Sequence, residues 1–516
     1  MEVKKETAAK ISLFGAVMII LGAMIGIGIF FKNDGVFRNN NGNAIGILIS
    51  WILSSIIAFS TIFCFSEVVS AKTRIKNSGL AGWTESFCGY KTGRAVQLIQ
   101  PIFYYGIYVI TMGVFCGEAI LNCFAPTPGT LAFGDLTMLY VVLIGLGIST
   151  IVITINCLSL RAGANVAKVT TVAKFLPLAM VVLFGFIFGG LNGGGLWVDP
   201  AINPDNTYSG EFSISGVFMS IPAIFFAFDS FLVVGNVYDN VNNPKKTVPL
   251  SIVISMIVVI VAYLLITFAQ ITIACGSPYQ VVNAAFSDPG VRQAFNIVFS
   301  ILMLIAVFGS NNSFCLTGIR SMQSLIDGKL VFGYQWFNKI SNGKKTEVFG
   351  GTILLIIFSV FYTITLSIPS IIMNNDQILD GFSTIIVLFF FFIYGTTILM
   401  TLINRKTKKV QVDKIKGFTT FAGIAIVGCY FVFFYCAIYQ FMIQPIVNPT
   451  GINANSFGLF IKYDRMLNWE VCLVFWMSIA WFFAIPFIND LLIKKFDKSY
   501  DKPLIWQKYK KAVNTL

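Results

Sequence analysis

Twelve long apolar stretches with almost no charge recur along the whole chain. Each has about 20 residues or more, the length at which an α-helix crosses the hydrocarbon core of a bilayer. Lipid offers no partner for an unpaired amide, so spanning segments are helices or closed barrels, and these stretches are too long and too uniformly apolar for barrel strands. We therefore predict an all-α integral membrane protein with twelve transmembrane helices. Their expected ranges are 11–31, 42–66, 95–117, 136–160, 175–198, 213–238, 247–274, 293–319, 348–369, 381–404, 417–443 and 471–489.

The composition agrees with a membrane protein and excludes several classes of enzyme. Only 11% of the 516 residues are charged, against about a quarter in soluble domains. The chain has no histidine, which removes imidazole catalysis, histidine-ligated metals and Ser-His-Asp triads. Its ten cysteines include no CxxC pair and lie mostly in apolar runs, so we expect small buried hydrophobes. We predict no enzymatic activity, no cofactor and no metal.

The excess of basic residues, a net charge of +13, orients the chain. With a cytoplasmic N-terminus and twelve crossings, 30 Lys and Arg fall in cytoplasmic segments and 5 in outer loops. This positive-inside bias predicts a multi-pass plasma membrane protein with both termini in the cytoplasm. We interpret the basic residues at 405–409 as an anchor attracted to anionic lipids, not as a nucleic-acid site. The outer basic residues are Lys32, Arg38, Arg292, Lys462 and Arg465.

Two of the predicted spans carry signals that weaken a helix. The first contains Gly22, Gly26 and Gly28, and each glycine costs a helix about 1 kcal/mol relative to alanine. These glycines favour either close helix packing or an unwound backbone whose amides face a ligand. The sixth span contains Pro222 and then Asp229 near its middle. A charge at that depth normally marks a water-filled cavity or a functional site.

The first and sixth spans are five helices apart, which suggests two inverted repeats of five helices. Interrupted helices at matching positions of two repeats point to a transporter site. Broken helices expose N–H groups that suit a carboxylate and C=O groups that suit an ammonium, the two charges of an α-amino acid. The expected segments are a cytoplasmic N-terminus at 1–11, repeats at 12–190 and 213–404, two further helices at 417–490 and a basic cytoplasmic tail at 491–516.

Five motifs in order resemble the amino acid permeases of the amino acid–polyamine–organocation (APC) superfamily. Residues 22–30 resemble the family's GxxIGxGIF, and 226–231 with 243–249 resemble its sixth-helix FAFxGFE and the K-N-P segment after it. Glu67 with 78–82, the stretch 156–174, and 309–328 supply the other three. The resemblance covers about residues 10–400. It implies the 5+5 inverted-repeat fold with two added helices, and alternating access around a central site.

This sequence departs from the family pattern in the sixth helix. Ser230 replaces the family glycine and Leu232 replaces the family acid, while an acid stands at Asp229 instead. The role of the family acid therefore does not carry over to Leu232. We expect Asp229 either to replace that acid as a proton carrier or to pair with a cationic substrate side chain.

We place the substrate carboxylate on the backbone of the first helix and the α-ammonium on carbonyls of the sixth. Phe226 resembles the family's aromatic lid, Phe314 is a second aromatic candidate, and one or two of the neighbouring tyrosines 104, 105 and 108 would line the cavity. The predicted substrate-binding residues are Ile25, Gly26, Ile27, Gly28, Tyr105, Phe226, Ala227, Phe228, Asp229, Ser230 and Phe314.

Coupling is expected at Lys174, with Ser310, Asn311 and Asp229. The ammonium of Lys174 would occupy the place of a sodium ion between helices 1, 5 and 8, as in similar members of the family, and would cycle a proton. The alternative is a lysine that snorkels to the cytoplasmic face. We expect Glu118, near the outer end of the third helix, to be a solvated vestibule residue.

The leading prediction is a secondary active importer of amino acids, coupled to protons and suited to cationic substrates. One alternative is an uncoupled exchanger or facilitator. A different class is a membrane-embedded nutrient sensor, although such proteins usually carry an added signalling domain and none is seen. An ATP-driven pump is disfavoured because the phosphate-binding G-x-x-x-x-G-K-[ST] signature is absent.

Overall fold

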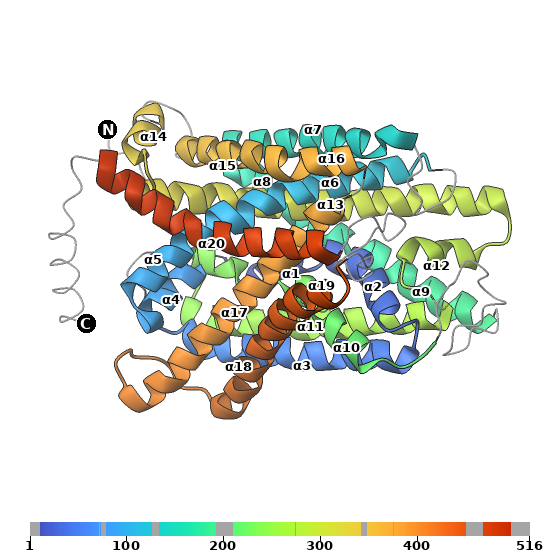
Figure 1. The fold of residues 1–516 in the computed structure, drawn as a ribbon, viewed down its shortest axis with the longest axis horizontal. Helices are drawn as coiled ribbons and strands as arrows, with labels where there is room; N and C mark the ends of the chain where they lie inside the picture. The colour runs from blue at the N-terminus through green and yellow to red at the C-terminus, as the bar shows by residue number, and fades with distance from the viewer. Residues whose placement is uncertain are drawn as a thin grey trace.

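The fold consists of helices that mostly run along the long axis of the molecule (Figure 1). The computed structural model describes residues 11–71, 73, 79–125, 134–191, 210–273, 275–341, 348–374, 376–449 and 468–496. Twelve helices in these ranges are long and apolar enough to cross a membrane, which confirms the predicted number of spans. The described residues form no named strand, only one isolated bridge between Ile11 and Val241. The predicted all-α class is confirmed.

The helices of the first half are α1 (Leu13–Met24), α2 (Ile27–Asn39), α3 (Ala44–Val68), α4 (Gly79–Cys88), α5 (Tyr90–Ile99), α6 (Gly106–Asn122), α7 (Thr137–Leu158), α8 (Leu160–Ala173) and α9 (Phe175–Leu191). Those of the second half are α10 (Ile214–Phe228), α11 (Pro244–Ile273), α12 (Pro278–Ala285), α13 (Pro289–Asp327), α14 (Tyr334–Ser341), α15 (Phe349–Tyr362), α16 (Ile368–Met373), α17 (Gln377–Thr407), α18 (Phe418–Tyr435), α19 (Gln444–Val447) and α20 (Asn468–Phe496). A π-helical turn, η1 (Gln100–Tyr105), joins α5 to α6, and a 3₁₀ segment, η3 (Val233–Asn240), follows α10.

Several helices begin where the sequence supplies a polar N-cap. The Ser12 hydroxyl accepts from the Gly15 amide at 3.2 Å, and the Ser213 hydroxyl accepts from Gly216 at 3.0 Å. Asn43 and Asp288 cap α3 and α13 in the same way. Each cap satisfies one of the free N–H groups of a helical first turn, which fixes where the helix starts.

The spans that contain α6 and α10 form the centre of the bundle. In each, 94% of the most apolar window is buried inside the protein, against 28% for the final span. α10 packs against α2, α3 and α17, and α13 packs against α6, α7 and α8. The third and sixth spans therefore lie at the core, whereas α20 lies at the periphery.

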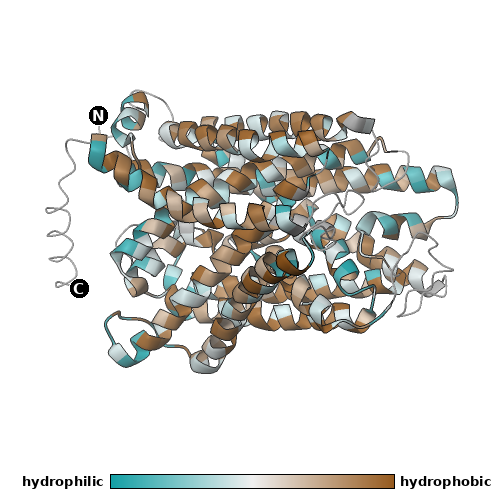
Figure 2. Cartoon of the chain, in the orientation of Figure 1, coloured by the Kyte–Doolittle hydropathy of each residue, from teal (hydrophilic) through white to brown (hydrophobic). Residues whose placement is uncertain are grey.

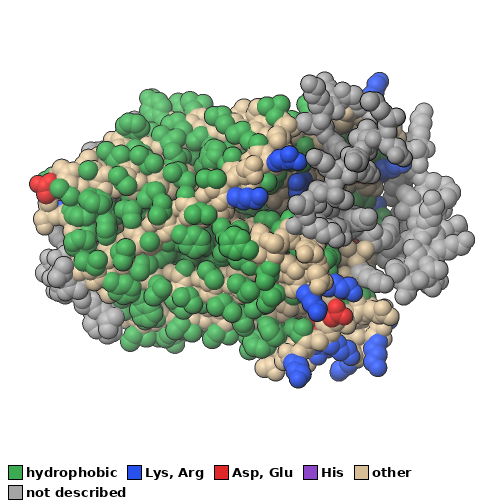
Figure 3. Space-filling model, turned by 180° about the vertical axis from the view of Figure 1, so that it is seen from behind, with side chains coloured by type: hydrophobic (Ala, Val, Ile, Leu, Met, Phe, Trp, Pro, Cys, Tyr) green, Lys and Arg blue, Asp and Glu red, His purple; other side chains and the backbone are tan. Residues whose placement is uncertain are grey.

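Apolar side chains cover the faces that a bilayer would contact. Figure 2 shows hydrophobic residues along the lengths of the helices and hydrophilic residues toward their ends. The reverse face is broadly apolar, and its Lys and Arg side chains gather toward one end (Figure 3). Exposed basic residues of the predicted cytoplasmic segments include Lys245, Lys246, Lys406, Lys408 and Lys409.

Three helices extend beyond the predicted apolar ranges. The first candidate span, Leu13–Phe30, agrees with the prediction of 11–31, and α2 continues to Asn39 with Lys32 and Asp34 inside it. The prediction that the fifth span begins at 175 is wrong, because α8 already starts at Leu160; its Arg161 and Lys168 lie on an exposed face. α20 runs to Phe496, inside the predicted tail at 491–516, and residues 497–516 lie outside the described ranges. The predicted ranges stop at charged residues, whereas the helices continue past these residues.

Candidate functional site

The first span is interrupted at Ile25 and Gly26. α1 ends at Met24, Ile25 is extended (φ −73°, ψ 109°), and α2 begins at Ile27. Space at this point requires glycine, because a Cβ on Gly26 would collide with the Ser310 hydroxyl and one on Gly28 with the Cα of Ala227. The glycines therefore bring the interrupted backbone directly against α13 and α10.

The sixth span loses its helical conformation at the acid. α10 ends at Phe228, and Asp229 is extended (φ −69°, ψ 175°). Ser230 follows with φ of 72°, a left-handed conformation that favours glycine. Ser230 stands where the resembled family has glycine. It adopts the left-handed conformation that glycine favours, and its side chain adds a hydroxyl group at this point.

Three tyrosine hydroxyls surround the carboxylate of Asp229, which is 3% exposed. Tyr104 donates to its Oδ2 at 2.5 Å, Tyr108 to the same oxygen at 3.4 Å, and Tyr394 to Oδ1 at 3.4 Å. The Tyr104 hydroxyl also lies 2.8 Å from that of Ser230. This buried acid is held by hydroxyls from α17 and from the α6 span, without a basic partner among the residues that the structure describes.

A small cavity of about 20 Å³ lies between the two interruptions. That volume holds roughly one water molecule. Its walls combine backbone, aromatic rings and the polar groups of α10 and α13. The lining residues are Ala23, Met24, Gly28, Tyr108, Met112, Phe226, Asp229, Ser230, Ser310 and Phe314.

Three aromatic rings form a stack along this cavity. Tyr108 stacks on Phe314 with ring centres 4.6 Å apart and 11° between planes, and on Phe226 at 5.9 Å and 26°. The ammonium of Lys32 lies over the Phe226 ring, 4.7 Å from its centre. The predicted lid residue Phe226 thus borders both the cavity that Asp229 lines and a second charged region around Lys32.

Several predicted residues lie away from the cavity lining. Tyr105 packs beside Gly318 and Phe314, because Tyr104 and Tyr108 share one helical face and Tyr105 is turned by about 100° from it. Phe228 packs on Trp51 and Tyr263. Ile25, Gly26 and Ala227 form or flank the interrupted backbone and are not among the residues that line the cavity. The side chain of Ile27, which was also predicted, lies outside the described residues.

Lys174 is fully enclosed at the junction of α8 and α9, with 0% exposure. Its ammonium donates to the Gly22 carbonyl at 2.5 Å and to the Ser310 hydroxyl at 2.8 Å. The snorkelling alternative is therefore wrong. Ser310 is a direct neighbour as predicted, whereas the Asn311 amide donates to Ser149 at 3.1 Å.

A buried ion pair near the Phe226 ring does not follow from the sequence pattern. Lys32 on α2 pairs with Asp380 on α17, and both side chains are at most 3% exposed. The same ammonium donates to Thr384 at 3.0 Å and to Ser383 at 3.3 Å. Both charges lie just outside the predicted apolar ranges, so we assigned Lys32 to a loop. The expectation of a solvated Glu118 is also wrong, because its side chain is 1% exposed.

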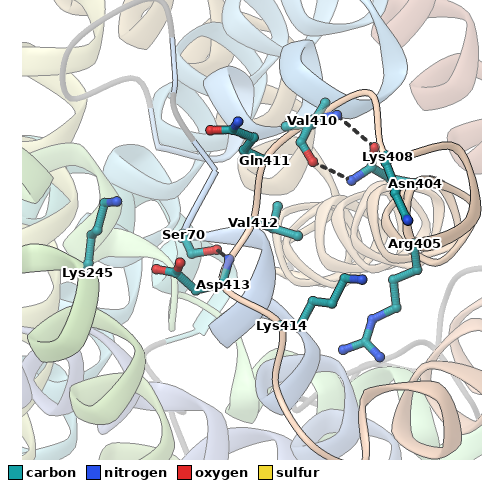
Figure 4. A pocket seen from close by; sticks show the side chains of 10 residues that line it. All are labelled: Ser70, Lys245, Asn404, Arg405, Lys408, Val410, Gln411, Val412, Asp413 and Lys414. Atoms are coloured by element: carbon teal, nitrogen blue, oxygen red, sulfur yellow. Dashed lines mark hydrogen bonds between the residues drawn. The ribbon is translucent and has the colours of Figure 1, made fainter.

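A larger cavity, about 370 Å³, lies at the basic end (Figure 4). Its basic lining residues are Lys245, Arg405, Lys408 and Lys414. Arg405 is committed to protein contacts, because its Nε donates to Glu67 at 2.9 Å and its guanidinium pairs with the same carboxylate. Arg405 is therefore paired within the protein, whereas the lysines of the predicted lipid anchor at 405–409 are exposed.

Comparison with known proteins identifies the family of this chain. The family model described as amino acid permease matches residues 11–461. A Mycoplasma pneumoniae protein of uncharacterized function is 25% identical over 86% of both chains. The serine/threonine exchanger SteT of Bacillus subtilis is 21% identical over 83% of this chain and 90% of its own. The human b(0,+)-type amino acid transporter 1 is 23% identical over 79% of this chain and 78% of its own. The chain belongs to the amino acid permease family, within the APC superfamily.

Proposed function

We propose that the protein is a secondary active transporter that imports amino acids by alternating access. The observation that carries this proposal is the meeting of two interrupted spans at one cavity, bordered by Gly28 on one side and Asp229 on the other. α2 begins there and presents free N–H groups, which suit a carboxylate. α1 and α10 end there and present free C=O groups, which suit an ammonium. The pair of termini matches the two charges common to all α-amino acids.

The size of the cavity implies a transport cycle with more than one conformation. A space of about 20 Å³ cannot hold an amino acid. In the proposed cycle, substrate entry therefore requires movement of the groups that line the cavity. Phe226 is the proposed lid, because its ring lines the cavity and lies 4.7 Å from the ammonium of Lys32.

Asp229 would select cationic amino acids. Its described partners are three hydroxyls, so its negative charge has no basic partner in the described residues. Asp229→Asn should selectively abolish uptake of lysine, arginine and ornithine and leave neutral substrates, because only the former need the charge. Unchanged uptake of cationic amino acids by this variant would contradict the assignment.

Lys174 is the proposed coupling residue. Its ammonium joins the carbonyl of Gly22 to Ser310 across three elements, in the place where the resembled family binds sodium. A neutral lysine would lose the charge that these acceptors stabilise, so loss of its proton would loosen α1 from α13. Uptake into proteoliposomes should follow an imposed proton gradient and not a sodium gradient. Lys174→Met should abolish proton-driven accumulation, and strict dependence on sodium would refute the assignment.

A panel of labelled amino acids in proteoliposomes is the experiment that tests the function itself. The relative SteT is named an exchanger, which favours uncoupled exchange as the second candidate function. An exchanger would show uptake only when amino acid is loaded inside, whichever gradient is imposed. A sensor would bind amino acids without any uptake.

We also propose a plasma membrane location with both termini in the cytoplasm. The gathering of Lys and Arg toward one end supports this orientation (Figure 3). The exposed lysines of that end, Lys406, Lys408 and Lys409, would attract anionic lipid. We call the opposite end of the protein, where α2 and α12 lie (Figure 1), the outer end.

A further inference from the structure

Four buried ionisable side chains meet in the outer half of the protein, beyond the aromatic stack. Lys32 comes from α2, Glu118 from α6, Asp380 from α17, and Asp376 from the N-cap of α17. Each is at most 2% exposed. Glu118 lies within electrostatic range of the other three. We call these four residues the outer cluster.

The outer cluster has more carboxyl groups than positive charges to balance them. Asp380 is the carboxylate that forms the ion pair with Lys32. Glu118 and Asp376 remain without a basic partner in the described ranges, and Oε2 of Glu118 and Oδ2 of Asp376 are buried with no hydrogen-bond partner. Burying an unpaired carboxylate costs several kcal/mol, whereas its protonated form is neutral.

Among the described residues, the titratable side chains around the cluster include no further cation. They are uncharged in their ordinary state: Cys116 and Tyr108 on α6, Cys123 at the C-cap of α6, and Tyr279 on α12. On α2, Asp34 is paired with Arg38 at 3.0 Å, outside the cluster. In the part of the chain that the structure describes, no three His, Cys, Asp or Glu side chains are arranged to hold a metal ion. Protons are therefore the cations that fit.

We propose that the outer cluster is a proton-binding site in which Glu118 and Asp376 are protonated whenever the outer side of the cavity is closed. When that side closes, each carboxylate accepts a proton from a hydronium ion of the outer solution: one O–H bond of hydronium breaks, the carboxyl O–H bond forms, and neutral water leaves. When it opens, water returns, and each carboxyl group gives its proton to a water molecule, which leaves as hydronium. Closure on the outer side thus depends on external protons, and Lys32 with Asp380 keeps the cluster assembled. Only the link to the transport cycle rests on the proposed function.

Infrared spectroscopy of the reconstituted full-length protein tests the site without requiring transport. The carbonyl stretching band of protonated carboxyl groups should be present at neutral pH and should shrink in Glu118→Gln and in Asp376→Asn. Asp34→Asn is the matched control, because Asp34 is an acid on α2 that is paired with Arg38, and it should leave the band unchanged. Loss of intensity in either cluster variant supports that residue as a proton holder, and an unchanged band in both overturns the proposal.

Folding of the variants gives a second criterion. An amide preserves the size and neutrality of a protonated carboxyl group, so Glu118→Gln and Asp376→Asn should fold with melting temperatures close to the wild type. A variant that no longer folds would also contradict the proposal, because it would mean that a negative charge is needed there.

The pH dependence of exchange then tests the role in the cycle. With internal pH fixed, wild-type exchange should fall as external pH rises from about 5 to about 8, because closure needs external protons. The Glu118→Gln/Asp376→Asn double variant should lose that dependence. A double variant with the wild-type profile would overturn the role of the site. If the wild type exchanges no amino acid at all, the proposed function fails, and the infrared result still decides the proton site.

Discussion

Buried carboxyl groups have different surroundings in two regions of the protein, the cavity beside Asp229 and the outer cluster. Asp229 is surrounded by hydroxyls of Tyr104, Tyr108 and Tyr394. The outer cluster instead contains one strong ion pair and two carboxyl groups, each with an oxygen that has no partner. A charge held by hydroxyls can remain ionised and attract a cation. A buried carboxyl group with one unpartnered oxygen and no basic partner is more stable with its proton, so the first region suits substrate recognition and the second suits a pH response.

The largest effect should come from breaking the ion pair of the outer cluster. Lys32→Met leaves Asp380 buried without its cation and should lower the free energy of unfolding by about 3–5 kcal/mol. The Lys32→Met/Asp380→Leu double variant should recover most of the loss, because no charge is then left unpaired. Thermal unfolding in detergent measures both variants. If the double variant is as unstable as Lys32→Met or more so, the ion pair itself stabilises the protein, and the loss in Lys32→Met is not due to the unpaired charge of Asp380 alone.

A smaller loss is expected at the contact between the two interrupted spans. Gly28→Ala places a Cβ against the Cα of Ala227, and such overpacking costs about 1–3 kcal/mol. Uptake should be lost even where the variant still folds. Gly147→Ala is the matched control, because Gly147 lies on α7 with no atom within 4 Å of an added Cβ. Full uptake by Gly28→Ala would show that this contact does not shape the site.

The smallest effect should come from removing one hydroxyl at Asp229. Tyr104→Phe deletes the 2.5 Å hydrogen bond, and hydrogen bonds to charged groups are worth about 1.5–3 kcal/mol. We expect the lower end of that range, since Tyr108 and Tyr394 remain. Substrate affinity should fall about tenfold, and Tyr105→Phe should change it little. A larger effect for Tyr105→Phe than for Tyr104→Phe would reverse our reading of which tyrosine face meets the acid.

The sequence predicts the site best where a charged residue lies inside a long apolar run. The twelve spans follow from unbroken apolar length, and Asp229 and Lys174 stand out because they are charges inside such runs. Lys32 and Asp380 were missed for the same reason, because a charge at the edge of an apolar run resembles the start of a loop. Only the three-dimensional pairing of α2 with α17 shows that both are buried.

Side-chain direction is the second limit of prediction from this sequence. Three tyrosines on one helix could each have faced the cavity, and we chose Tyr105. The structure brings Tyr104 and Tyr108 to Asp229. The π-helical turn η1 ends at Tyr105 and shifts the helical register there, so spacing in the sequence alone did not identify the inward face.

Counterflow in proteoliposomes tests the central claim most directly. Vesicles that contain the purified protein are loaded with an unlabelled amino acid, and entry of the same labelled amino acid is followed without any imposed gradient. Wild-type protein should accumulate label transiently and saturably, and Gly28→Ala should not, because the two interrupted spans can no longer meet at the cavity. Binding of amino acids without counterflow, or equal counterflow in the wild type and Gly28→Ala, would contradict transport through this site.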